Sequence, residues 1–269
     1  MRPCPGALAR RAIGAGLVTA ALSIGACGPR PVRAPALPIS EVYERYRVAL
    51  EARERRSAAV ESDIAVWVRL PDRGRLPGVQ AALWMAAPGA ARLRVGSTFG
   101  TALDLAARGD SVTLYVPSRR AYAQADANTD SLGVREPGAW MVRAWCGTWR
   151  AGAAAFDAGA LEGAPHVARW MERGDSLTLA VDAAGLPAWL RVRRAGSELR
   201  VDYPEWGAWD GVRWPARIEV SEGDGGFHLT CRVQRVRFPA RAEPGRMAVR
   251  MPADAERHEW WELRRALER

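Results

Sequence analysis

Apolar and polar residues alternate along most of the chain from residue 63 onward. The alternation is clear in the segment 227–233, where Phe, Leu, Cys and Val alternate with His, Thr and Arg. Turn-forming pairs such as Pro88-Gly89, Gly109-Asp110 and Ala184-Gly185 separate the segments. A period of two with one polar face is typical of antiparallel strands buried on one side. The pattern predicts about a dozen antiparallel strands in meander order, forming one curved sheet.

One change of parity interrupts this pattern near the end of the sheet. Val233 continues the apolar set of its strand, whereas Val236 and Phe238 fall on the alternate positions. A single extra residue in one strand produces such a shift. The sequence therefore predicts a β-bulge near Gln234.

Three segments have a helical period instead. An early helix is expected from Ser40, as N-cap, to about Arg56, with a face carrying Arg53 and Arg56 in solvent. An inserted helix is expected before Gly147, and a terminal helix over residues 253–269. The apolar positions that define them are Ile39, Tyr43, Tyr46 and Leu50 in the first, Trp140, Met141, Ala144 and Trp145 in the second, and Trp260, Trp261, Leu263 and Leu267 in the third.

The N-terminus has the features of an export signal. Arg2, Arg10 and Arg11 precede an uncharged, largely apolar run over residues 12–26 that is too short to span a bilayer. The run ends in Ile24-Gly25-Ala26-Cys27, which matches the lipobox of bacterial lipoproteins. We therefore expect residues 1–26 to be a signal peptide and Cys27 to be acylated, for example with palmitate; ordinary secretion is the alternative.

Residues 27–39 are rich in proline and favour an extended polyproline II tether between the anchor and the folded part. Residues 1–26 carry three arginines and no acidic residue, so their removal lowers the formal charge from +9 to +6. A charge of this size favours weak attraction to anionic lipid, and export argues against nucleic acid as a partner.

Cys146 and Cys231 are the two cysteines that remain after processing. An oxidising compartment permits a disulfide between them, which in the chain-entropy model would contribute about 4–5 kcal/mol to stability. Both also have apolar neighbours in the sequence, so two buried free thiols are the other interpretation.

No pattern of catalytic or metal-ligating residues emerges. His166, His228 and His258 lie far apart, and the sequence has no Cys-x-x-Cys pair, nucleophile elbow or phosphate-binding glycine loop. The carboxylates between 202 and 219 are most simply surface acids near strand ends. We expect a protein that is not an enzyme, with no metal and no cofactor. The 12 tryptophans are either core residues or the lining of a lipid-sized groove.

Several stretches resemble the LolA/LolB-like family of lipoprotein carriers and receptors, more closely the membrane-anchored LolB branch. The resemblance covers roughly residues 40–238, and its motifs are loose patterns; the stretches that carry it are 91–105, 109–122, 143–147, 201–203 and 214–218, with the Gly225-Gly226 turn. The terminal helix has no counterpart in it.

The resemblance implies an incomplete antiparallel barrel closed by helices, whose apolar cavity takes lipoprotein acyl chains. It therefore implies a mainly β (α+β) fold, a half-barrel of about 11–12 strands. Phe99 before Gly100 matches an apolar residue on a protruding turn that helps pass lipoprotein into the membrane; a phenylalanine folded back onto its own sheet is the alternative. The residues expected to line the cavity or its helical lid are Tyr46, Leu50, Trp140, Met141 and Trp145.

These observations predict a half-barrel domain over residues 40–252, followed by the terminal helix. The expected function is binding of acyl chains at the periplasmic side of the outer membrane, without catalysis, with lipoproteins received from a periplasmic carrier protein. The alternative is a structural lipoprotein that uses the same sheet to bind proteins, in which case its own side chains fill the concave side.

Overall fold

The computed structural model describes residues 37–98, 100–126, 136–157, 166–194, 196–223 and 226–267. The predicted signal peptide, Cys27 and nearly all of the predicted tether lie outside these residues. Residues 36–269 form one compact unit, to which the C-terminal helix belongs.

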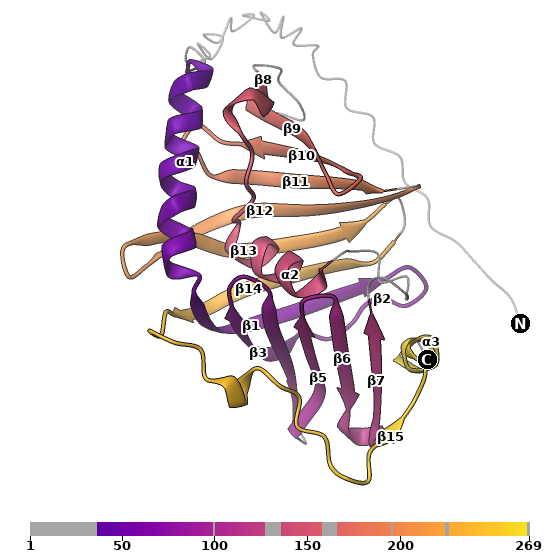
Figure 1. Cartoon of the computed structure of the whole chain (residues 1–269). Helices are drawn as coiled ribbons and strands as arrows, with labels where there is room; N and C mark the ends of the chain where they lie inside the picture. The colour runs from indigo at the N-terminus through magenta and orange to yellow at the C-terminus, as the bar shows by residue number, and fades with distance from the viewer. Residues whose placement is uncertain are drawn as a thin grey trace, which may run out of the picture. The chain divides into compact units, whose positions relative to one another are not determined.

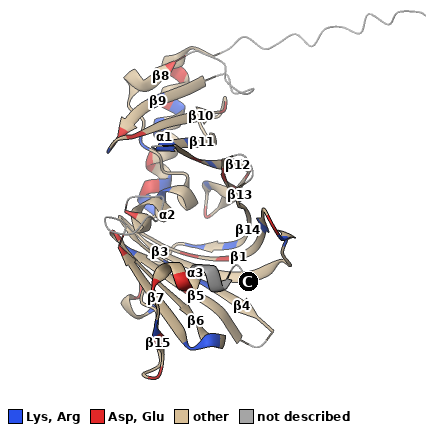
Figure 2. Ribbon diagram, turned by 90° about the vertical axis from the view of Figure 1, so that its right-hand side faces the viewer, with Lys and Arg blue, Asp and Glu red and all other residues tan. Residues whose placement is uncertain are grey.

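The described residues form one open sheet of 15 strands, which confirms the predicted mainly β half-barrel (Figure 1). Figure 2 shows its strong curvature, with β8–β13 and β3–β7 on either side of β14 and β1. The strands are β1 (Ala59–Leu70), β2 (Gly74–Arg75), β3 (Val79–Ala86), β4 (Ala90–Ser97), β5 (Gly100–Arg108), β6 (Ser111–Val116), β7 (Ala121–Asp126), β8 (Phe156–Asp157), β9 (His166–Glu172), β10 (Asp175–Val181), β11 (Pro187–Arg194), β12 (Ser197–Trp209), β13 (Val212–Glu222), β14 (His228–Arg237) and β15 (Glu256–Arg257).

The sheet consists of two meanders that meet at a long-range seam. One contains β1 and β3–β7, the other contains β8–β14, and β1 pairs antiparallel with β14 between them. The bulge predicted near Gln234 is confirmed, because Asp63 pairs with Arg235 and the next residue, Ile64, pairs with Val233. Three of the described strands, β2, β8 and β15, have only two residues, which explains why the sequence pattern predicted 11–12.

The early helix, α1 (Ile39–Arg56), begins before the predicted position. Pro38, not Ser40, is the N-cap, because its carbonyl accepts the hydrogen bonds of the Glu41 and Val42 amides at 3.0 and 3.1 Å. Ser40 lies within the first turn. The inserted helix, α2 (Pro137–Cys146), ends as predicted at Gly147, which adopts the left-handed conformation with φ +63°.

The C-terminal segment differs from the single helix predicted over 253–269. After β14 the chain crosses the outer face of β3–β7, as the "outer strap" of residues 238–255 (Figure 1). It then forms β15, the one parallel neighbour in the described sheet, because Glu256 and His258 donate backbone hydrogen bonds to the carbonyls of Arg120 and Tyr122 at 2.7 and 2.8 Å. The helix itself, α3 (Trp260–Leu267), is correspondingly short. Three single-turn 3-10 helices are also present: Pro117–Arg119, Ala153–Ala155 and Pro244–Arg246.

The core lies on one face of the sheet, called the inner face here. The "main core" joins α1 and α2 to the alternating apolar residues of β1, β3, β4 and β9–β14. Its largest fully buried members include Trp149, Trp214 and Tyr46. Burial of apolar surface at about 25 cal/mol per Å² makes this layer the main source of stability.

Candidate functional site

The inner face beneath α2 is where the predicted cavity residues come together. Tyr46 and Leu50 of α1 are buried in the main core, with exposed fractions of 0% and 7%. Trp140, Met141 and Trp145 of α2 are only half-buried and lie against the edge of that core. The structure therefore places all five residues on the inner face, but only the three in α2 retain apolar surface that a ligand can reach.

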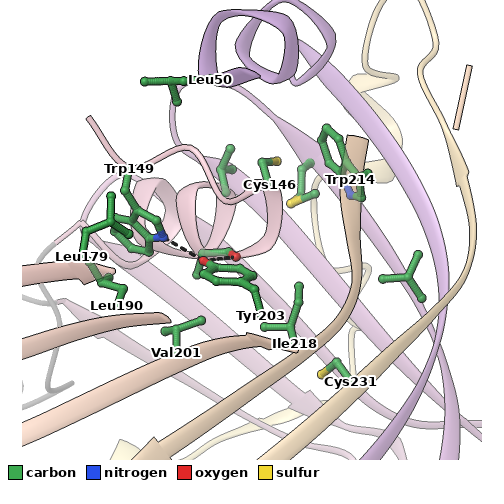
Figure 3. Close-up of a cluster of buried hydrophobic side chains, with 14 of the residues drawn as sticks. Leu50, Cys146, Trp149, Leu179, Leu190, Val201, Tyr203, Trp214, Ile218 and Cys231 are labelled. Atoms are coloured by element: carbon green, nitrogen blue, oxygen red, sulfur yellow. Dashed lines mark hydrogen bonds between the residues drawn. The ribbon is translucent and has the colours of Figure 1, made fainter. Parts of the chain in front are cut away.

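Hydrogen bonds hold the chain after α2 against the sheet (Figure 3). The Trp149 indole donates to the Tyr203 hydroxyl at 2.7 Å, and that hydroxyl donates to the carbonyl of Ala144 at 2.8 Å. The Ala151 amide donates to the Tyr46 hydroxyl at 3.2 Å. These contacts satisfy polar groups inside an apolar layer and fix the end of α2 to both α1 and β12.

Arg53 is fully buried in this region, whereas the sequence pattern placed it on a solvated face of α1. Its Nη2 donates to the carbonyl of Gly147 at 3.3 Å, and its guanidinium lies 5.0 Å from the ring centroid of Trp206. Nε and Nη1 have no hydrogen-bond partner among the described residues. Burial disfavours the cation and lowers the pKa of Arg53 to about 10. Arg53 is buried because the end of α2 supplies the Gly147 carbonyl as an acceptor and β12 supplies the aromatic face of Trp206. The spacing of residues within α1 reveals neither contact.

The two cysteines are free and buried in the structure, which is the second of the two interpretations left open by the sequence. Cys146 ends α2, whereas Cys231 lies on β14, and Figure 3 shows them on these separate elements. Desolvation raises the pKa of both thiols, that of Cys231 to about 12.

Stability should therefore fall as the pH rises above 9, where thiols in the unfolded chain lose their protons and the buried ones keep them. The unfolded state then binds fewer protons, so each thiol should lower the free energy of unfolding by about 1.4 kcal/mol between pH 8 and pH 10. Urea unfolding of the wild type and of the Cys146→Ala/Cys231→Ala variant at both pH values measures this. An equal loss in the two proteins would contradict the assignment.

A small cavity lies between α2 and the inner face of β10–β12. Its volume is about 40 Å³, room for only a few water molecules. Its apolar lining is Trp140, Trp149, Leu177, Val192 and Leu199. An acyl chain does not fit this volume, so any larger ligand needs the helices to move or the side chains to rearrange.

Ion pairs surround this small cavity. Arg143 of α2 pairs with Glu172 at 2.7 Å, and Arg194 pairs with Asp175 at 2.7 Å. Arg173 pairs with Glu136 at 2.5 Å, at the N-terminal end of α2. Pairs in this partly exposed setting contribute little to stability. They give the cavity an apolar floor and a charged rim.

Half-buried apolar residues continue away from this cavity over the inner face. Across the strands they form the "inner apolar strip", which packs against the main core without being fully covered. Its members are Val68, Val79, Leu93, Val95, Val192, Val220 and Leu229. A strip of half-covered apolar side chains in a concave layer is the kind of surface on which a hydrocarbon chain can be buried.

A second hollow lies on the opposite face of the sheet. This outer groove has a volume of about 1040 Å³ and runs between the outer strap and β3–β7. Most of its lining is small or apolar, including Ala106, Met247 and Met251, with Arg108 as a charged member. None of the residues predicted for the site lines it. Sequence reasoning missed this groove because the outer strap has no periodic pattern that would place it on the sheet.

The predicted membrane-contacting turn joins β4 to β5. Gly100 opens β5, is exposed and has φ +116°, and a Cβ there would meet no atom within 4 Å. Phe99 lies outside the described residues, so its predicted role stays a prediction. None of the helices in the described ranges is both long and apolar enough to cross a membrane. Among the same residues no three His, Cys, Asp or Glu side chains form a group suited to a metal.

Solved structures with the same architecture identify the fold. The chain superposes on an outer membrane lipoprotein-sorting domain from Vibrio parahaemolyticus with a TM-score of 0.51 and 10% identity, covering 75% of this chain and 97% of that one. A LolA superfamily protein from Nitrosomonas europaea gives a TM-score of 0.51 and 12% identity, with 80% and 99% covered. No protein-family model and no curated protein sequence matches. The protein has a LolA/LolB-like fold, as the resemblance in the sequence indicated, and this likeness does not distinguish the LolB branch.

Proposed function

We propose that the protein is a non-catalytic lipoprotein, anchored to the outer membrane through acylated Cys27, whose half-barrel binds acyl chains. It would receive lipoproteins from a periplasmic carrier and pass them to the membrane, as a LolB-like receptor does. The observation that carries the proposal is the inner apolar strip, continued by Trp140, Met141 and Trp145 of α2, in a LolA/LolB-like fold. Burial of a hydrocarbon chain there is favourable at about 25 cal/mol per Å² of apolar surface.

A second candidate function is a protein-binding platform without a ligand cavity. It is favoured by one contrast: the inner cavity measures about 40 Å³, whereas the outer groove measures about 1040 Å³. A filled inner side leaves the outer groove and the sheet surface for a protein partner. The two functions differ in whether the inner side opens for a hydrocarbon chain.

Native mass spectrometry and displacement of a fluorescent long-chain fatty acid separate the two functions. The experiment uses the chain from Gly28 onward, which contains the whole compact unit, purified in the absence of detergent. Stoichiometric binding that unlabelled fatty acid displaces would support the acyl-chain site. No bound lipid and no uptake of the probe would refute it and leave the platform.

The Trp140→Arg variant should bind the fatty-acid probe at least roughly tenfold more weakly than the wild type. The substitution places a cation where the hydrocarbon chain of the probe would be buried. Trp140 is suited to the test because it lines the cavity and is half-buried. The matched control is Met171→Arg, since Met171 is apolar but 66% exposed on β9. Equal weakening of probe binding by both substitutions would mean that the added positive charge acts without lying in the acyl-chain site.

A further inference from the structure

The inner face of β5–β7 carries a small apolar cluster of its own. Leu114, Val116, Ala121 and Ala123 are buried there, and Leu263 of α3 is buried against them with an exposed fraction of 2%. This "edge core" is separate from the main core. Leu103, Leu105 and Trp260 pack around it. Its cover is therefore α3, which lies beside β7 in Figure 1 and over β5–β7 in Figure 2.

The edge core and the inner apolar strip belong to one continuous surface. Leu93 of the strip pairs across β4 and β5 with Leu105, Leu105 pairs with Leu114, and Leu114 pairs with Ala123. Side chains of directly paired residues lie on the same face of a sheet. An apolar row thus runs from the region below α2 to the region below α3.

The attachment of α3 differs from that of the other two helices. In α1, Arg53 and Tyr46 hydrogen-bond to the chain after α2, and the turn at Gly185 contacts the helix backbone directly. By contrast, among the side chains of α3 that the structure describes, Trp260 and Leu263 contact the edge core, and the helix follows a strand of two residues. A helix of eight residues is not stable in isolation, so it depends on this docking for its structure.

We propose that the inner face of β5–β7 is a second part of the acyl-chain site and that α3 is its displaceable cover. This inference rests on the proposed function and extends it. An acyl chain entering along the apolar row replaces Trp260 and Leu263 on the edge core, and α3 moves off the sheet. The hydrocarbon of the ligand supplies the apolar contacts that α3 gives up.

The test compares the wild type with a Trp260→Ala/Leu263→Ala variant, each from Gly28 onward, using the fluorescent long-chain fatty acid. Because α3 competes with the chain, weakening its docking should increase the uncovered fraction and tighten probe binding by roughly tenfold. Trp261→Ala is the matched control, since Trp261 lies on the same helix but is 55% exposed. Its affinity should equal that of the wild type. Thermal unfolding of all three proteins establishes that they are folded.

Hydrogen exchange of the wild type gives a second readout that needs no substitution. Addition of the fatty acid should speed exchange of the amides of residues 260–267, because α3 leaves the sheet. Probe binding that is identical in the wild type and the double variant, or slower exchange of α3 with the probe bound, would overturn this inference and leave the acyl-chain site beneath α2. Absence of probe binding in every protein would refute the proposed function and this inference together.

Discussion

Replacing Asp104 by alanine should lower the free energy of unfolding by about 3–5 kcal/mol. Asp104 accepts hydrogen bonds from Nε and Nη2 of Arg92 at 2.7 and 2.5 Å, and the two residues are only 4% and 2% exposed. The substitution leaves the Arg92 guanidinium buried over the Trp84 ring, with the carbonyl of Arg246 as its remaining hydrogen-bond acceptor at 3.0 Å. Urea unfolding at neutral pH measures the loss.

Two further variants serve as controls for the Asp104→Ala variant. Asp254→Ala removes the carboxylate of an exposed pair with Arg120, so its effect should stay below about 1 kcal/mol. The double variant Arg92→Met/Asp104→Leu removes both charges and should recover most of the stability lost by Asp104→Ala. A loss from Asp104→Ala no larger than that from Asp254→Ala would show that the outer strap does not keep water from the pair.

The Gly185→Ala variant should be destabilised by about 2–5 kcal/mol, because two costs add. Gly185 has φ +79°, which costs an alanine about 1–2 kcal/mol, and overpacking typically costs about 1–3 kcal/mol more. The overpacking is with the backbone of α1, since a Cβ on Gly185 would lie 2.4 Å from the Tyr46 nitrogen and 2.5 Å from the Arg45 carbonyl carbon. The backbone of a helix cannot yield locally, so α1 must shift.

Gly174 provides the matched control for this variant. Its φ of +87° is similar, but a Cβ there would meet no atom within 4 Å, so Gly174→Ala should cost only about 1–2 kcal/mol. The difference between the two variants, read from urea unfolding, isolates the contact between α1 and the 182–186 turn. Equal losses would mean that α1 is not held firmly against that turn.

Much of the sheet could be predicted because each strand has one buried face. The alternation at Leu229, Cys231 and Val233 reappears as buried or half-buried inner-face positions, and the parity change marks the bulge at Gln234. Gly147 was predictable as a helix end because few residues adopt its left-handed conformation. These features depend on neighbours in the sequence, which is why the sequence pattern reveals them.

The features that the sequence did not predict depend on distant partners. Arg92 and Asp104 occupy polar-face positions that would be solvated on a bare sheet, but the outer strap covers them. Arg53 has the spacing of an exposed helix residue and is buried only because the end of α2 lies over it. The three α2 residues of the candidate site were predicted, but the position of α3 over the edge core was not, because it follows from the backbone pairing of β15 with β7.

The pairing of β1 with β14 also bears on the order in which the chain can fold. Residues 61–69 find their second strand partner only in residues 228–237, so the loop closed by this pairing includes most of the protein. Long-range pairing of this kind is slow to form, because the entropy of closing the loop precedes any gain from contacts. In the export that we propose, the chain emerges from its N-terminus, so β1 stays unpaired on one side until β14 has followed it. The edge of β1 that β14 covers leaves backbone hydrogen-bonding groups unpaired for that whole interval, so the proposed export and the folding of the sheet would be coupled.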